Sequence, residues 1–278
     1  MTCTNVLVST CILKPTSSTE KFEKMNTLRF LGTGTSCGVP QIGCTCPVCT
    51  SSDPHDARLR TSVLLETDDG VRLIFDCGPD FRQQMLGVPF GPLHAVLISH
   101  EHYDHVGGLD DLRPFKHFGQ VDVYAETVCA SHLREHMPYC FGKNPYPGSP
   151  RIDLHAISAG QPFAVCGHEI LPIEVLHGKL PILAFRIGSF AYVTDMSAIS
   201  PDALSALRGV RHLVINALRT KPHPTHQTLD EALAVIRHLS PEQAWLVHMS
   251  HEIGLHAEVQ PALPPHVTLA YDGMVATW

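Results

Sequence analysis

The 278-residue sequence contains no apolar run that approaches the roughly 20 residues needed to cross a bilayer. It also has no excess of basic residues, because 20 Lys and Arg stand against 27 Asp and Glu, for a formal net charge of −7. This balance argues against long nucleic acid as a partner, since such proteins carry a basic surface. The first 26 residues lack the basic start and long apolar core of a secretory signal, so we expect a cytoplasmic protein with no membrane partner.

The N-terminal stretch, residues 1–26, is predicted to be a disordered tail or to precede a true start at Met25. The first convincing strand lies just after it, at residues 28–31. Residues 27–278 are predicted to form a single domain, which is long enough to bury a sizeable core.

Short apolar runs broken by Gly, Asp and Pro fill the rest of the chain, with hairpins early and strand–helix alternation later. This order predicts two packed sheets with helices outside. The proline-rich residues 139–150 are predicted to form a surface loop or lid. The predicted strands cover residues 28–31, 61–66, 71–75, 94–98, 184–187, 190–194, 212–215, 244–247 and 267–271, and the predicted helices cover residues 108–117, 201–207 and 228–239.

Histidine is unusually frequent, with 19 residues, and three of them fall in the stretch SHEHYDHVGG at positions 99–108. His100, His102, Asp104 and His105 follow directly after a predicted buried strand, which is where binding sites are commonly built. Imidazole and carboxylate suit zinc, manganese or iron. Four donors on one short loop serve two ions more easily than one, so the pattern predicts a dinuclear site; the alternative is a solvated His-rich turn.

Cysteine is also clustered: three of the ten lie at Cys44, Cys46 and Cys49. In a reducing compartment such clusters more often bind metal than form disulfides. One further ligand would complete a tetrahedral zinc site, and His251 is the candidate. This closed ligand set predicts a structural zinc. The alternatives are reduced cysteines without metal, or ligation by Cys37 or Cys77.

The pattern His-x-His-x-Asp-His resembles the signature of the metallo-β-lactamase-fold hydrolases, and the likeness extends over about residues 27–275. The resemblance implies an α/β fold, an αββα sandwich of two mixed β-sheets flanked by helices. It also implies two divalent metal ions, Mn or Zn, at the active site. Their expected ligands are His100, His102 and His177 for one ion, Asp104, His105 and His248 for the other, and Asp195 as a bridge.

The family also has an aspartate that orients a ligand histidine, and Asp76 in IFDCG matches it. Taken singly, Asp76 and Asp195 could be turn residues after strands, and His177 could simply precede the Gly178 turn.

The stretch GTGTSCGVPQIGCTCPVC, together with HMSH at residues 248–251, resembles one branch of this family. That PhnP-like branch contains the phosphoribosyl cyclic phosphodiesterases of the carbon–phosphorus lyase pathway. By this resemblance His226 is the active-site histidine that holds no metal and acts as general acid, Asp104 is the other catalytic residue, and a homodimer is expected. His223 is the rival of His226.

The implied function is hydrolysis of a small phosphodiester, foremost a cyclic ribose phosphodiester, by a hydroxide that bridges two metal ions. A tRNA 3′-processing endoribonuclease would use the same metals but would need a basic arm to bind RNA. The insertion at residues 139–150 contains one basic residue, Lys143. A thioester or lactone hydrolase would leave the cysteine cluster without precedent, and a β-lactamase would be exported. A zinc-stabilised binding protein is the non-enzymatic alternative.

Overall fold

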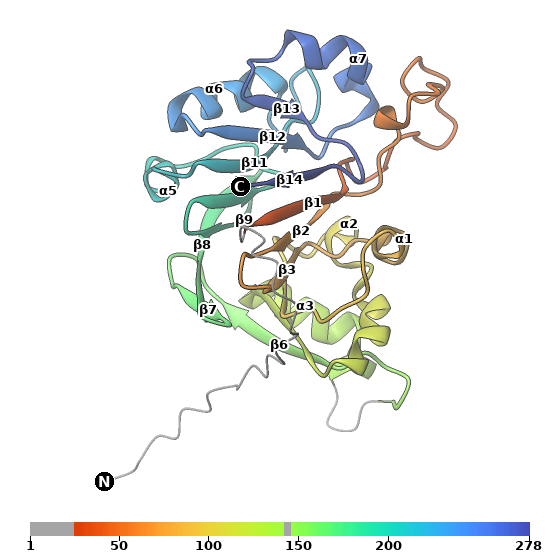
Figure 1. Cartoon of the computed structure of the whole chain (residues 1–278), viewed down its shortest axis with the longest axis vertical. Helices are drawn as coiled ribbons and strands as arrows, with labels where there is room; N and C mark the ends of the chain where they lie inside the picture. Colours follow the sequence, from red (N-terminus) through yellow and green to blue (C-terminus); the bar gives the residue numbers. More distant parts are fainter. Residues whose placement is uncertain (1–24, 142–145) are drawn as a thin grey trace, which may run out of the picture.

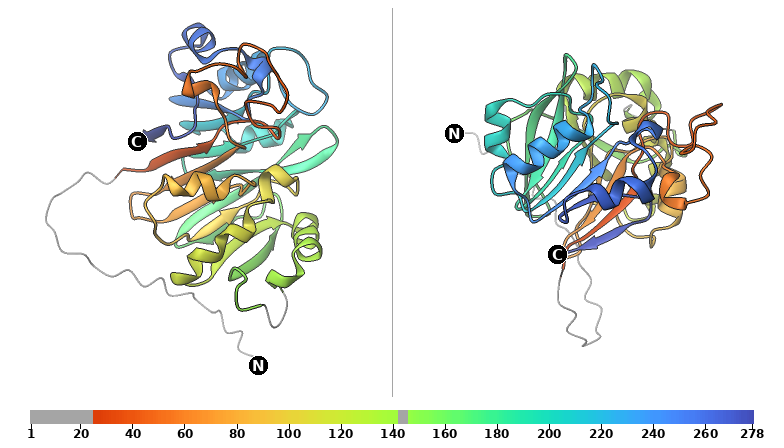
Figure 2. Two further views of the ribbon diagram at one scale, coloured as in Figure 1. Left: turned by 90° about the vertical axis from the view of Figure 1, so that its right-hand side faces the viewer. Right: turned by 90° about the horizontal axis from the view of Figure 1, so that it is seen from above.

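Two seven-stranded β-sheets lie face to face in the part of the chain that this computed structural model describes, residues 25–141 and 146–278 (Figures 1 and 2). Helices cover the outer face of each sheet, so the predicted αββα sandwich is confirmed. The predictions for residues 1–24, a tail or an alternative start, lie outside the described residues.

The first sheet combines an antiparallel half with a parallel half. β1 pairs antiparallel with β14, placing Thr27 opposite Thr277. The predicted hairpin of residues 61–66 and 71–75 is confirmed, with Val63 opposite Phe75. In spatial order the strands are β14 (Val275–Thr277), β1 (Thr27–Gly32), β2 (Ser62–Glu66), β3 (Arg72–Phe75), β4 (Ala95–Leu97), β5 (Val121–Glu126) and β6 (Ile152–Ile157).

The second sheet is mixed in the same way, with a parallel half from β10 to β13 and an antiparallel half from β7 to β10. The predicted hairpin around Gly188 is confirmed, although its first strand begins earlier than expected. In spatial order the strands are β13 (Val267–Leu269), β12 (Gln243–Val247), β11 (His212–Asn216), β10 (Phe190–Val193), β9 (Leu180–Ile187), β8 (His168–His177) and β7 (Phe163–Val165).

The α-helices are α1 (Phe81–Leu86), α2 (Tyr103–Val106), α3 (Thr127–His136), α4 (Pro138–Phe141), α5 (Pro201–Ala206), α6 (Leu229–Leu239) and α7 (His256–Val259). Short 3₁₀ helices are η1 (Pro54–Asp56), η2 (Leu109–His117), η3 (His251–Ile253) and η4 (Gln260–Ala262). Within the described ranges, none of these helices has the length and apolar character that a bilayer crossing requires.

Large side chains fill the space between the two sheets, including Phe30, Phe75, Phe185 and Trp245. Outside the second sheet, α6 begins at a capping box in which Thr228 and Glu231 satisfy each other's backbone N–H groups, as the sequence predicts. Its buried residues then follow the helical period and pack on the sheet. Each layer therefore follows from a local pattern of apolar residues.

The segment predicted as a helix at residues 108–117 is helical, but it is the 3₁₀ helix η2. Its buried residues Leu109, Leu112 and Phe115 recur every three positions, and a 3₁₀ helix has three residues per turn. Residues 139–150 were expected to be a loop or lid; α4 instead extends to Phe141, residues 146–150 form a turn, and residues 142–145 lie outside the described residues.

Candidate metal centre

The donor residues predicted from the sequence meet at one edge of the sandwich, where strands of both sheets end. Since the strands carrying them end at this edge, side chains distant in sequence converge there. Asp76 follows β3, the loop of His100, His102, Asp104 and His105 follows β4, His177 ends β8, Asp195 follows β10 and His248 follows β12.

Three of these residues adopt a left-handed backbone conformation that is uncommon outside glycine. Their φ angles are 59° at Asp76, 53° at Asp195 and 57° at His248. Such a conformation costs on the order of 1–3 kcal/mol and persists only where the surroundings impose it. Each of the three stands just after a buried strand, so the strain falls on the positions that build the site.

The seven predicted ligands form two compact donor groups. His100, His102 and His177 place their ligand atoms within 4.8 Å of one another, and so do Asp104, His105, Asp195 and His248. Asp195 also reaches the first group, because its Oδ2 lies 3.7 Å from Nε2 of His100 and 3.2 Å from Nε2 of His105. The geometry is that expected of two neighbouring cation sites that share the Asp195 carboxylate.

Hydrogen bonds from the Nδ1 atoms hold three of the imidazoles in place. His105 Nδ1 lies 2.8 Å from Asp76 Oδ2, and His177 Nδ1 lies 2.8 Å from the backbone oxygen of Asp195. His100 Nδ1 lies 2.9 Å from Ser99 Oγ. Because these oxygen acceptors favour a proton on Nδ1, the Nε2 lone pairs are left to face a cation.

Asp76 is fully buried and forms several hydrogen bonds at once. Besides His105, its carboxylate accepts from the backbone N–H of Ser99 at 2.8 Å, from Ser99 Oγ at 3.1 Å and from Tyr192 Oη at 2.9 Å. One carboxylate therefore orients His105 directly and His100 through Ser99. The sequence predicts Asp76 beside a ligand histidine, but it shows Ser99 and Tyr192 only as neighbours of the two ligand segments.

The buried charges of the site indicate that it binds cations. Asp76, Asp104 and Asp195 are all buried, and among the described residues their ion-pair partners are histidines. Burial opposes the charge of Asp195, but His248 and His105 outweigh it and hold its pKa well below the usual value. Nε2 of His105 is buried 3.1 Å from Asp104 Oδ2 and 3.2 Å from Asp195 Oδ2, although it forms no hydrogen bond within the described structure. Buried carboxylates that face imidazole nitrogens at this distance fit divalent cations.

His226 lies beside the shared carboxylate, with its Nε2 3.5 Å from Asp195 Oδ2. Its Nδ1 lies 2.9 Å from Thr225 Oγ1 and 3.1 Å from Nδ1 of His223, so both candidate histidines stand together. Burial lowers the pKa of His226 to about 4, which makes the imidazole neutral near pH 7. The protonated state assumed for a general acid is therefore disfavoured in the protein alone.

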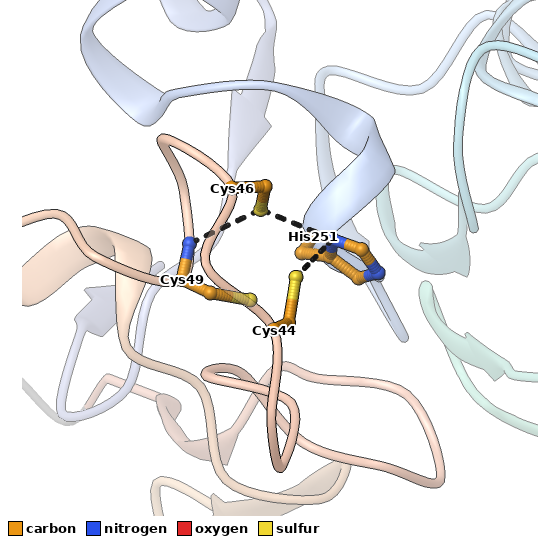
Figure 3. A group of neighbouring side chains, drawn as sticks. All are labelled: Cys44, Cys46, Cys49 and His251. Atoms are coloured by element: carbon orange, nitrogen blue, oxygen red, sulfur yellow. Dashed lines mark hydrogen bonds between the residues drawn. The ribbon is translucent and has the colours of Figure 1, made fainter.

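The cysteine cluster and His251 lie together in the structure (Figure 3). The ligand atoms of Cys44, Cys46, Cys49 and His251 lie within 4.8 Å of one another. Nδ1 of His251 is 3.6 Å from Sγ of Cys44 and 3.2 Å from Sγ of Cys46. A tetrahedral zinc would separate its sulfur and nitrogen ligands by roughly 3.5 Å, so these residues could hold one. The alternative ligands Cys37 and Cys77 lie outside the group.

The environment of Cys46 favours a thiolate. A hydrogen bond from the backbone N–H of Cys49, with a further contribution from His251, lowers the pKa of Cys46 to about 6 although burial opposes it. The two segments that form the cluster are also joined beside it, because Met249 exchanges backbone hydrogen bonds with Thr33 and Thr35. The loop that bears the cysteines is thereby fixed to the segment between His248 and His251.

Two glycines allow the histidine-rich loop to pack tightly. A Cβ on Gly78 would lie 2.1 Å from the backbone oxygen of Asp104, and a Cβ on Gly108 would lie 2.1 Å from the backbone oxygen of Gly78. No real Cβ tolerates such contacts. The second glycine of the SHEHYDHVGG stretch is therefore needed for the loop to reach the turn that carries Asp76.

Comparison with known proteins agrees with this geometry. Residues 71–249 match the family described as a beta-lactamase superfamily domain. A crystal structure described as a new diphosphatase from the PhnP family superposes with a TM-score of 0.84 at 38% identity, over 91% of this chain and 97% of that one. The chain belongs to the PhnP family of the beta-lactamase superfamily. A diphosphatase is a hydrolase, so this relative supports the enzyme class that the sequence predicts for the PhnP-family chain.

More distant structures share the fold alone. Zn²⁺-bound PqqB from Methylobacterium extorquens has a TM-score of 0.73 at 19% identity, covering 90% of the PhnP-family chain and 99% of its own.

Among curated proteins, an octanoyltransferase from Porphyromonas gingivalis is 46% identical over 248 residues, 89% of this chain. The PhnP-family chain spans 50% of that protein's length, and between 32% and 51% of the PqqB relatives that match first.

Proposed function

We propose that this protein is a dinuclear-metal phosphodiesterase that hydrolyses a small phosphodiester, with a cyclic ribose phosphodiester as the first candidate. The observation that carries the proposal is the position of Asp195 between the two donor groups, within 3.7 Å of Nε2 of both His100 and His105. Two ions held about 3.5–4 Å apart are the arrangement typical of phosphate-ester hydrolases.

His100, His102 and His177 would hold one ion, and Asp104, His105 and His248 the other, with Asp195 shared. When bound, a pair of divalent ions, Mn or Zn, supplies an activated water and neutralises charge on the phosphate. The cysteine group would hold one structural zinc, because its four protein ligands leave no position for a substrate or water.

The chain's own residues contribute orientation and a hydrogen-bond donor. Asp76 and Ser99 hold the rings of His105 and His100, so the donor groups are preorganised. His226 presents Nε2 at the edge of the Asp195 carboxylate, and a neutral ring protonated there can donate a hydrogen bond to a phosphate or leaving oxygen. Thr225 and His223, on its other nitrogen, fix the orientation of that ring.

Diphosphate hydrolysis is the second candidate, and the PhnP-family diphosphatase at 38% identity favours it. The same donors suit a phosphoanhydride, whose cleavage also develops charge on phosphate oxygens. Acyl transfer has weaker support, because the octanoyltransferase relative is twice the length of the matched region.

The test is hydrolysis of bis(p-nitrophenyl) phosphate by protein reconstituted with manganese or zinc, beside ADP, inorganic diphosphate and an octanoyl thioester. We expect metal-dependent release of p-nitrophenol, lowered at least tenfold by Asp195→Asn with loss of bound metal. His226→Ala is expected to lower the rate at unchanged metal content. Hydrolysis of diphosphates alone would favour the second candidate. Activity toward the thioester alone, at full metal content, would contradict the proposal.

A further inference from the structure

β11 lies between two strands that lead to donors of the metal centre, but neither donor group takes a residue from it. On one side β10 leads to Asp195, and on the other side β12 leads to His248. Asn216 is the last residue of β11 and pairs with Val247, the residue before His248. The side chain of Asn216 is fully buried. Because a buried amide must find its hydrogen-bond partners within the protein, its contacts show what it holds.

The amide of Asn216 continues the pairing of β10 with β11 beyond the point where the two backbones part. Their ladder ends at Val193 and Ile215. Beyond it, Oδ1 of Asn216 accepts the backbone N–H of Met196 at 2.9 Å, and Nδ2 donates to the backbone oxygen of Met196 at 3.0 Å. A side-chain amide can do this because it has the donor and acceptor of a peptide group. Met196 follows Asp195, whose left-handed φ is 53°, so both bonds hold the chain just after that turn.

Asn216 is also joined to the segment that carries His226. Gln227, the residue after His226, is buried, and its Nε2 donates to the backbone oxygen of Asn216 at 2.6 Å. The backbone N–H of Gln227 donates to the oxygen of Met196 at 2.9 Å, and this is the oxygen that Nδ2 of Asn216 also contacts. Met196, Asn216 and Gln227 therefore form one closed, buried network that connects three segments of the chain.

The network links the shared carboxylate to the histidine beside it. Met196 directly follows Asp195. Gln227 directly follows His226, whose Nε2 lies 3.5 Å from Oδ2 of Asp195. Thr194 Oγ1 donates to Oδ1 of Asp195 at 2.8 Å, but Thr194 belongs to the same turn. Its bond orients the carboxylate without anchoring the turn to the rest of the protein, so the anchoring depends on the network.

We propose that Asn216 is a positioning residue for hydrolysis, which fixes the carboxylate of Asp195 and the imidazole of His226 relative to each other. The inference rests on the proposed function, because it takes Asp195 as the ligand shared by two ions and His226 as the hydrogen-bond donor. Asn216 acts through the backbone of Met196 and the side chain of Gln227, and not through contact with the reacting groups.

Two variants separate the two halves of the network. Asn216→Ala removes the anchor of Asp195, so it is expected to weaken manganese binding at least tenfold, as loss of a group that orients a ligand usually does. Its kcat at saturating manganese is expected to fall at least tenfold. Gln227→Met removes the side-chain bond to Asn216 alone, so kcat is expected to fall at least threefold while manganese affinity stays within twofold of the wild type. In both variants KM is expected to change less than twofold.

Manganese is the probe because thiolates prefer zinc, so the cysteine group contributes little to the titration. Titration against a chelator measures the affinity. The values of kcat and KM are measured with whichever of the four substrates named above the wild type hydrolyses fastest. Gln84→Ala is the matched control, since Gln84 is also buried and its amide donates to the backbone oxygen of Arg60 at 2.8 Å. This control is expected to lose stability in urea as Asn216→Ala does, but to keep the manganese affinity and kcat of the wild type.

Manganese affinity and kcat in Asn216→Ala that are no lower than in Gln84→Ala would overturn the positioning role. If Asn216→Ala does not fold, Gln227→Met decides: a lowered kcat at wild-type manganese affinity supports the role, and a wild-type kcat overturns it. Failure of the proposed function looks different, because the wild type then does not hydrolyse the diester. The manganese affinities of Asn216→Ala and Gln84→Ala still decide the role of Asn216 in that case.

Discussion

Tyr192 Oη donates a hydrogen bond of 2.9 Å to Oδ2 of Asp76, and both side chains are fully buried. Tyr192 belongs to β10 of the second sheet, and Asp76 follows β3 of the first. The same oxygen of Asp76 lies 2.8 Å from Nδ1 of His105. The packing of one sheet on the other is thereby linked to the orientation of a donor imidazole.

Tyr192→Phe is expected to weaken metal binding and stability together. Removing one partner of a hydrogen bond to a buried charged group costs about 1.5–3 kcal/mol, and loss of a group that orients a ligand typically lowers metal affinity about 10–100-fold. Urea unfolding and metal titration against a chelator would measure the two effects. Tyr124→Phe, a hydroxyl removed elsewhere in the first sheet, is the control. Equal metal affinity in the two variants would contradict the linkage.

Cys46→Ser is expected to remove one zinc ion per chain. Sγ of Cys46 is the sulfur nearest to His251, and the remaining ligands would leave the ion incompletely coordinated. Mass-spectrometric metal analysis of purified protein measures the content, and calorimetry measures the accompanying fall in melting temperature. Cys37→Ser, an exposed cysteine outside the group, should retain all the zinc. Identical zinc content in both variants would disprove the assignment of a structural site.

Gly108→Ala is expected to destabilise the protein by about 1–3 kcal/mol, the usual cost of forcing an added carbon into a packed region. The cause is the 2.1 Å approach of the new Cβ to the backbone oxygen of Gly78. Gly87→Ala provides the comparison, because the nearest atom there is 3.8 Å away and φ is −86°. Chemical denaturation of both variants measures the difference, and a Gly108 variant as stable as the Gly87 variant would refute the packing argument.

His94 is expected to make stability depend on pH. Its Nδ1 accepts the backbone N–H of Arg72 at 2.9 Å, and burial together with the charge of Arg72 lowers the pKa of the imidazole. The folded state therefore disfavours the proton, so this contribution to stability is present above the unfolded pKa of about 6.5 and is lost as the pH falls below it.

The test is to compare urea unfolding of the wild type and His94→Asn between pH 8 and pH 5. Asparagine keeps an acceptor but does not titrate, so the variant should match the wild type at pH 8 and lose less stability on acidification. Parallel curves for the two proteins would show that His94 contributes nothing to the pH dependence.

The dense spacing of His100, His102, Asp104 and His105 is visible in the sequence, and the family resemblance added the donors that stand at later strand ends. Asp195 after AYVTD and His248 after AWLVH are of this kind. The capping box of α6 was equally local. Contacts between distant segments are not visible as a local sequence pattern. The bond from Tyr192 to Asp76 spans 116 positions, and neither residue reveals the other.

Residues 120–180 were left largely unassigned, for two different reasons. β5 alternates buried and half-buried positions in the sequence VDVYAE, a period of two that predicts a strand and was missed. β8 carries Pro172 and two glutamates and does not alternate regularly, so its period is concealed. The cavity of about 540 Å³ that Glu101 and Tyr103 line also depends on α3 and α4 from this same region.

The pairing of β1 with β14 has a practical consequence for joining this chain to other proteins. β1 runs in the same direction as β3, so Thr27 and its partner Thr277 lie at the edge opposite the one that carries Asp76. A neighbouring module attached near either of these residues would be tethered away from the donors and would leave their entrance open.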